Sequence, residues 1–226
     1  MIRLLLLALV FAVPSLAPSL ARAQTVQQSV VDRSTLTVQG MMGAREGRDA
    51  RQLMARARGV LVCPQVFQAG FIIGGKGGNC VLSGRLARGW SAPAFYDLAS
   101  GSIGLQAGVQ DSEVLLIVLT DKGLQALIDD QFQIGGAAGV SFATYGTGVS
   151  GGLTTALKAD VVSFSRSRGL FAGLALDGSV LSVRSGWNTT YYGRPIAAQQ
   201  LVIQGEGSNP GAAPLQEMLL KFQQPG

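Results

Sequence analysis

The sequence predicts a single α+β domain in which an antiparallel sheet or barrel-like core is framed by N- and C-terminal helices. A hydrophobic content of 47% against 14% charged residues is typical of a packed globule. Short apolar runs separated by glycine fill the middle of the chain, whereas helical periodicity is confined to its two ends. The 226 residues show no internal repeat and no linker, so one domain is the simplest organisation.

The first 23 residues have the pattern of a secretory signal peptide. Arg3 supplies the positive start, Leu4–Val13 is an apolar run, and Ala21–Ala23 is a small-x-small cleavage signal. We therefore expect cleavage after Ala23 and a periplasmic or secreted mature protein. The apolar run is shorter than the roughly 20 residues of a membrane-spanning helix, and no later run approaches that length.

Residues 24–58 are predicted to form an N-terminal helical segment. Val26, Val30 and Val38 recur at near-helical spacing, which predicts an amphipathic helix over Thr25–Met42 that ends near Gly43. A second helix is expected within residues 44–58.

Residues 59–204 are predicted to form the β-rich core. The glycine run Gly74–Gly78 lacks the G-x-x-x-x-G-K-[ST] order of a phosphate loop, so we interpret it as a turn between strands. Thr120 is expected to cap one short helix that ends before Phe132, and Asp177-Gly178 is a favourable hairpin turn. Strands are expected over residues 59–67, 71–73, 104–109, 113–120, 138–143, 160–165, 169–176 and 179–184.

The C-terminal part returns to helical patterns. After an aromatic and polar stretch over 187–193, a short helix is expected over 195–203. Residues 205–226 are predicted to be a tail with a glycine- and proline-containing spacer and one small helix near 215–222.

Two cysteines, Cys63 and Cys80, lie in neighbouring apolar segments. An oxidising compartment favours a disulfide between them, whereas two buried free thiols are the alternative. Two cysteines alone do not make a structural zinc site.

The composition excludes several function classes. The chain has no histidine, which removes Ser-His-Asp triads and His-ligated zinc or haem, so the serine-hydrolase pattern at Gly148–Gly152 lacks its base. We expect no catalytic residues, no metal and no cofactor. Without Arg3 and Arg22 the mature chain has 16 basic and 13 acidic residues, and a net charge of +3 is too mild for a nucleic-acid-binding protein.

Arginines are concentrated directly before the β-rich core. A solvated helix face is one interpretation of this run, and contact with an anion or a membrane surface is the other. Lys76, Arg85 and Arg88 would extend the same patch around the predicted hairpin. The aromatic residues Phe67, Phe71, Trp90, Phe95 and Tyr96 are candidates for insertion at an interface, although such residues beside strands more often belong to the core. The predicted lipid-binding residues are Arg45, Arg48, Arg51, Arg56, Arg58, Lys76, Arg85 and Arg88.

Six ordered segments resemble the SYLF domain family. They are Ala57–Leu61 leading to Pro64, Ala69–Phe71, Trp90–Pro93, Gly104–Gly108, Ser167–Gly173 and Tyr191–Gly193. They span nearly the whole mature chain in the order of the family.

The resemblance implies a lipid-binding domain without catalysis, with phosphoinositides and other anionic lipids as ligands. Family members in eukaryotes place a lysine-rich amphipathic helix before the core, whereas the matching helix here carries only Asp32 and Arg33 as charges. An exported bacterial protein would not meet actin, so we do not expect actin as a partner. The leading hypothesis is an envelope protein that binds anionic lipid or a membrane surface peripherally. The alternative is a structural or envelope-assembly protein that acts through protein–protein contacts.

Overall fold

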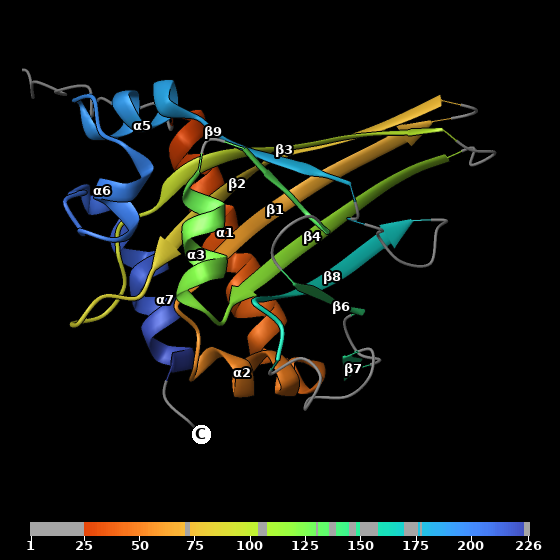
Figure 1. The fold of residues 1–226 in the computed structure, drawn as a ribbon, viewed down its shortest axis with the longest axis horizontal. Coiled ribbons are helices and arrows are strands. Elements are labelled where there is room, and N and C mark those ends of the chain that lie inside the picture. The colour runs from red at the N-terminus through yellow and green to blue at the C-terminus, as the bar shows by residue number, and fades with distance from the viewer. Residues whose placement is uncertain are drawn as a thin grey trace, which may run out of the picture.

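The computed structural model describes residues 25–70, 73–103, 108–129, 131–135, 139–144, 148–149, 158–169, 176 and 178–223. Within this part of the chain, nine strands form one curled sheet with the order β5-β9-β3-β2-β1-β4-β8-β6-β7 (Figure 1). Helices pack on the sheet and lie at both ends of the described chain. The predicted single α+β domain is therefore confirmed.

The long strands β1 to β4 form the centre of the sheet. Among the described pairs, all are antiparallel except β6 with β8, so the predicted antiparallel sheet is mixed at one place. The strands are β1 Gly59–Gly70, β2 Ile73–Gly84, β3 Ala94–Ile103, β4 Gly108–Val118, β5 Gln131–Gln133, β6 Val140–Thr144, β7 Gly148–Val149, β8 Val161–Gly169 and β9 Val180–Val183.

The predicted helices are present with small shifts at their ends. Thr25 caps the first helix by accepting the N–H of Gln28 at 3.2 Å, and Thr120 caps α3 by accepting the N–H of Gly123 at 3.0 Å. The α-helices are α1 Val26–Gly43, α2 Arg48–Met54, α3 Asp121–Ile128, α5 Ser185–Tyr192, α6 Ala198–Val202 and α7 Ala213–Gln223. Two 3₁₀ turns, Arg45–Gly47 and Pro210–Ala212, precede α2 and α7.

Both faces of the sheet are buried near its base, which we define as the end where β1 begins and β2 ends. Successive residues of a strand point to opposite faces, so Val60 and Val62 pack in the core of α1, α2, α5 and α7, whereas Leu61 packs in the core of α3 and α6. Burial on both sides explains why β1 and β4 begin or end in continuous apolar runs instead of alternating patterns.

Most of the aromatic interface candidates are core residues. Trp90, Phe95 and Tyr96 are buried, and the ring of Phe95 packs edge-on against Tyr191 with centroids 5.0 Å apart. Phe67, in contrast, is 49% exposed.

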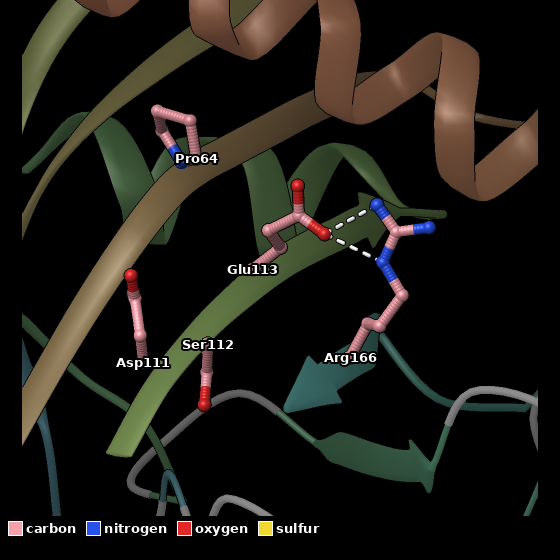
Figure 2. Close-up of a pocket in the computed structure, with 5 residues that line it drawn as sticks. All are labelled: Pro64, Asp111, Ser112, Glu113 and Arg166. Atoms are coloured by element: carbon pink, nitrogen blue, oxygen red, sulfur yellow. Dashed lines mark hydrogen bonds and ion pairs between the residues drawn. The ribbon is translucent and has the colours of Figure 1, made fainter. Parts of the chain in front are cut away.

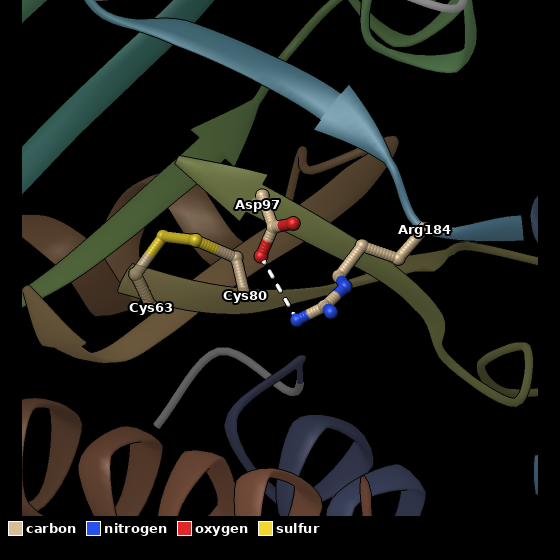
Figure 3. The surroundings of a disulfide bond; sticks show 4 residues. All are labelled: Cys63, Cys80, Asp97 and Arg184. Atoms are coloured by element: carbon tan, nitrogen blue, oxygen red, sulfur yellow. Dashed lines mark hydrogen bonds and ion pairs between the residues drawn. A yellow bond between two sulfur atoms is a disulfide. The ribbon is translucent and has the colours of Figure 1, made fainter. Parts of the chain in front are cut away.

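A disulfide joins β1 to β2, which resolves the two alternatives for the cysteines. Cys63 and Cys80 are both fully buried, and they lie beside an irregularity in β1 where the pairing register shifts between Val62 and Gln65 (Figure 3). Near the bond, Arg184 forms an ion pair of 3.1 Å with Asp97, which fixes the end of β9 to β3.

One sequence-based interpretation of the core is wrong, and one helix is not predicted by the sequence. Gly74–Gly78 is not a turn, because it lies within β2 and pairs with both β1 and β3. A side chain at Gly78 would place its Cβ 2.3 Å from the carbonyl oxygen of Gln65, so glycine there serves the irregular pairing with β1. The aromatic stretch after Arg184, to which the sequence assigned no element, forms the helix α5 and ends at Gly193 in the left-handed conformation.

Several predictions fall outside the described residues. These are the signal peptide over 1–23, residues 104–107 of the predicted strand over 104–109, the predicted strand over 169–176 apart from its two ends, Asp177 of the predicted turn, Phe71 and most of the Gly148–Gly152 pattern. Gly178, the other residue of that turn, is described and has the positive φ of 74° that the turn requires. None of the helices that the structure describes is long and apolar enough to cross a membrane.

Candidate anion-binding site

Three of the predicted arginines line one hollow at the base of the sheet. The segment between α2 and β1 carries Arg56 and Arg58, and Arg85 follows directly after β2. Together with Ala55, Ala57 and Leu119 they surround an open hollow of about 320 Å³. We call Arg56, Arg58 and Arg85 the arginine cluster.

Strand pairing brings Arg58 and Arg85 together. Gly59 pairs with Gly84, and the N–H of Arg85 donates to the carbonyl of Arg58 at 2.8 Å. The N–H of Arg58 in turn donates to the carbonyl of Val118 at the end of β4. The two arginines are therefore held at neighbouring positions by the backbone of three central strands.

The guanidinium of Arg85 is half-buried and held in place. Its Nη2 donates to the carbonyl of Met54 at 2.7 Å, and the group lies 5.3 Å from the ring centroid of Trp90. Its buried Nε has no hydrogen-bond partner among the residues that the structure describes. Arg85 is thus a cation held in place by Met54 and Trp90, with further N–H donors that can still be satisfied.

The electrostatics of the cluster favour an anion. Burial and, secondarily, the positive charge of Arg58 hold the pKa of Arg85 below its usual value, although a guanidinium stays charged at neutral pH. Arg58 has one acidic partner, Asp121, at 3.4 Å, and both side chains of this pair are mostly exposed. Such an exposed pair is weak. An anion in the hollow would therefore relieve the repulsion between Arg58 and Arg85.

Arg51 has a structural role that the sequence did not reveal. Its Nη1 donates to the carbonyls of Met42 and Ala44, the second at 2.8 Å. These carbonyls lie at the C-terminus of α1, where the last C=O groups have no partner inside the helix. Arg51 therefore caps α1 and does not line the hollow.

The other predicted basic residues are not gathered in the hollow. Arg45, Arg48 and Arg88 are exposed, and Arg88 lies in the turn between β2 and β3. Lys76 lies nine residues before Arg85 along β2, which corresponds to roughly 30 Å of extended strand. The eight predicted residues thus do not form one continuous patch.

A second hollow, on the sheet face covered by α1, is dominated by an ion pair. Pro64, Asp111, Ser112, Glu113 and Arg166 line it, and Arg166 donates from Nε and Nη2 to Glu113 (Figure 2). Glu113 also accepts the hydroxyl of Thr37 at 3.3 Å. The hollow has a volume of about 70 Å³, which is room for about two water molecules and too little for a larger ligand. We therefore assign a structural role to the Glu113–Arg166 pair: it holds α1 against β4 and β8.

Sequence reasoning missed the groups that support the cluster. Trp90, a candidate for membrane insertion in the sequence, instead lies beside the guanidinium of Arg85, and nothing in the sequence indicates that Asp121 pairs with Arg58. Arg85 and Trp90 face each other across a bridge in the connection between β2 and β3, so this contact is local, whereas Arg58 and Asp121 come from parts of the chain far apart in sequence. Among the described residues, no three Cys, Asp or Glu side chains are arranged to hold a metal ion.

Comparison with known proteins identifies relatives of the chain. Residues 99–222 match the sequence profile of the Ysc84 family, whose description is "Las17-binding protein actin regulator". The human "SH3 domain-containing YSC84-like protein 1" is 31% identical over 173 residues, which is 75% of this chain and 50% of the human protein.

A similar match extends to yeast. The "Protein YSC84" of Saccharomyces cerevisiae is 26% identical over 206 residues, covering 89% of this chain and 44% of the yeast protein. The chain thus spans about half the length of the relatives it matches. No solved structure is significantly similar to it.

Proposed function

Because this chain belongs to the Ysc84 family of SYLF domains, we propose that it is a non-catalytic protein of the bacterial cell envelope that binds anionic phospholipid surfaces. The observation that carries the proposal is the arginine cluster, which holds three cations around one open hollow with a single exposed acidic partner. Phosphate groups of the phosphoinositide type match this arrangement, because arginine binds phosphate oxygens through paired donors.

An extracytoplasmic location belongs to the same proposal. The signal-peptide pattern at residues 1–23 and the Cys63–Cys80 disulfide support it, because disulfides persist in oxidising compartments. There the protein would contact membranes peripherally. A protein-binding role is the alternative, and it is supported by the name of the family, which refers to the binding of a protein.

The test is sedimentation of residues 24–226 with vesicles of zwitterionic lipid or of lipid containing an anionic phospholipid. Arg56→Gln/Arg58→Gln removes two exposed charges and leaves the contacts of Arg85 to Met54 and Trp90 intact. At about 1 kcal/mol per arginine near an anionic surface, we expect affinity for anionic vesicles to fall about 30-fold. Salt near 1 M should weaken wild-type binding as well, because it shortens the screening length to about 3 Å.

A matched control removes the same charge elsewhere. Lys76→Gln/Arg194→Gln changes the net charge equally at positions outside the hollow, and it should bind anionic vesicles nearly as well as the wild type. Equal losses in the two double variants would reduce the effect to net charge and refute the site. If the wild type binds neither vesicle, the lipid proposal is wrong and protein–protein contact becomes the better explanation.

A further inference from the structure

One half of a sheet face is open, and its side chains are mostly small or apolar. The exception on β4 is the exposed carboxylate of Asp111, which pairs with Phe67 and accepts a hydrogen bond from the amide of Gln65. Strands β1 to β4 extend beyond the helices that cover the base of the sheet (Figure 1). In this part Phe67 pairs with Gly77, and Gly77 pairs with Ala99, which places small or apolar residues side by side on the face that carries α1. We call these residues the apolar floor: Phe67, Ala69, Gly75, Gly77, Ala99, Gly101 and Val109.

The apolar floor faces outward and offers mainly C–H surface. Phe67 and Val109 are 49% and 57% exposed. The backbone of β1 is paired with both β2 and β4, and that of β2 with both β1 and β3, so no peptide could add here as a further strand. A ligand on this surface would therefore gain affinity from apolar contact.

A groove with a cation at its rim begins where the floor meets α1. Val30 and Arg33 of α1 form one wall, Gln65 and Phe67 of β1 line the groove, and Gly77 forms its base, enclosing about 330 Å³. This volume is at the lower end of the range for small-molecule sites and is too small for a helix.

The rim cation is available to an anion. Arg33 is exposed and donates at 2.9 Å to Gln65, whose amide nitrogen donates in turn to Asp111. In the described part of the chain no carboxylate lies within ion-pair distance of Arg33. The side chain of Gln65 lies between Arg33 and Asp111 and hydrogen-bonds to both. Arg33 uses only part of its N–H donors in this contact, so others remain for a negatively charged group.

The dimensions fit a single hydrocarbon chain better than a flat membrane. From Gln65 in the groove to Ala69 at the far side of the floor, β1 runs for roughly 13 Å, close to half of the ≈ 30 Å hydrocarbon core of a bilayer. α1 lies on the same face and stands about 10 Å above the floor, the diameter of a helix. A planar bilayer would thus meet α1 first, whereas one chain can lie beside it.

We propose that the apolar floor binds the hydrocarbon chain of one anionic amphiphile, with its charged end at Arg33. This site is separate from the arginine cluster, and it needs no membrane. The ligand is a monomer taken from solution, with a carboxylate or phosphate head and a chain as long as one bilayer leaflet.

The probe is dodecanoate, titrated calorimetrically into residues 24–226 below its micelle-forming concentration. We expect saturable binding of one molecule. Phe67→Gln should weaken it about tenfold through the loss of apolar contact. Gly77→Gln should do the same by filling the groove, and it should fold, since a Cβ at Gly77 would have the carbonyl of Leu98 at 3.6 Å as its nearest neighbour. Leu220→Gln is the matched control, because Leu220 is a 43% exposed apolar residue on α7.

The charge at the rim is tested separately with Arg33→Gln, a change on an exposed helix surface. It should weaken dodecanoate two- to fivefold, the range of an exposed ion pair, and leave the binding of dodecyltrimethylammonium unweakened. Arg56→Gln/Arg58→Gln should bind dodecanoate like the wild type, which separates this site from the proposed membrane contact. No saturable binding, or equal effects of Phe67→Gln and Leu220→Gln, would overturn the site. Equal wild-type affinities for the two probes would overturn the role of Arg33.

Discussion

Reduction of the Cys63–Cys80 bond should lower the free energy of unfolding by about 3 kcal/mol. The two cysteines are 17 residues apart in sequence, and closing a loop of that length removes about 10 cal/mol/K of entropy from the unfolded chain. Both residues are fully buried in a packed region, so reduction changes the cross-link and leaves every carbon atom of the core in place. Reduced and oxidised wild type therefore isolate the effect of the bond.

The assay is urea unfolding of the oxidised and the reduced protein at the same pH. The reduced form should unfold at lower urea, and its thermal midpoint should fall by roughly 6–12 °C for a domain of this size. Cys63→Ala/Cys80→Ala should lose somewhat more, because it also removes two buried sulfur atoms, and it should not respond to reductant. Superimposable curves for the oxidised and reduced wild type would refute the entropic argument, as would two alkylatable thiols in the native oxidised protein.

Three further predictions concern other parts of the fold. Gly84→Ala should lower the free energy of unfolding by about 1–3 kcal/mol in urea, because the new Cβ would lie 2.2 Å from the carbonyl oxygen of Val202, the last residue of α6. Gly101→Ala is the control: its Cβ would have no atom within 4 Å, so the free energy of unfolding should change by less than about 1 kcal/mol. Arg51→Met should cost about 2 kcal/mol by freeing the C-terminal carbonyls of α1, yet leave vesicle binding unchanged. Hydrogen bonds from the hydroxyl of Thr120 and, secondarily, from the backbone N–H of Gly139 lower the pKa of Asp160. Its stabilisation is thus present above about pH 4 and lost as the pH falls through the lower folded value, and Asp160→Asn should flatten that part of a pH–stability curve.

The ends of the chain could be predicted because their signals are local. Thr25 caps α1 and the apolar spacing fixes the buried face, and both are visible in the sequence alone. The sequence predicts no strand at the position of β3, because small and polar residues fill the second half of this strand, where it forms part of an uncovered surface. The glycine run of β2 was misassigned for the same reason. The β-propensity of a residue mainly reflects how well its side chain packs on a covered sheet surface. The glycines of β2 have no such side chain and are held in the sheet by backbone pairing with strands on both sides.

The candidate site could be predicted only as a set of residue types. The sequence singles out the arginines that precede β1, but it contains nothing that separates Arg51, which lies in α2 and caps α1, from Arg56, which lines the hollow. The proximity of Arg58 to Arg85 depends on the pairing register of β1 and β2, which is a long-range property. The sequence places Lys76 with them only through the interpretation of Gly74–Gly78 as a turn, whereas this run lies within β2.

The packing of α1 against α7 has a consequence for how the chain acquires its structure. Among the described helices, α1 is synthesised before all the others and α7 after them, yet both contribute to one core, where Val38 and Leu219 are buried together with residues of β1 and β4. During synthesis the apolar side of α1 stays partly exposed until α7 has been made and can pack against it. Contacts of such high sequence separation favour slow folding and leave the incomplete chain open to aggregation. We therefore expect the incomplete chain to need protection from aggregation while it is made, and deletion of the 11-residue α7 to be far more damaging than its length suggests.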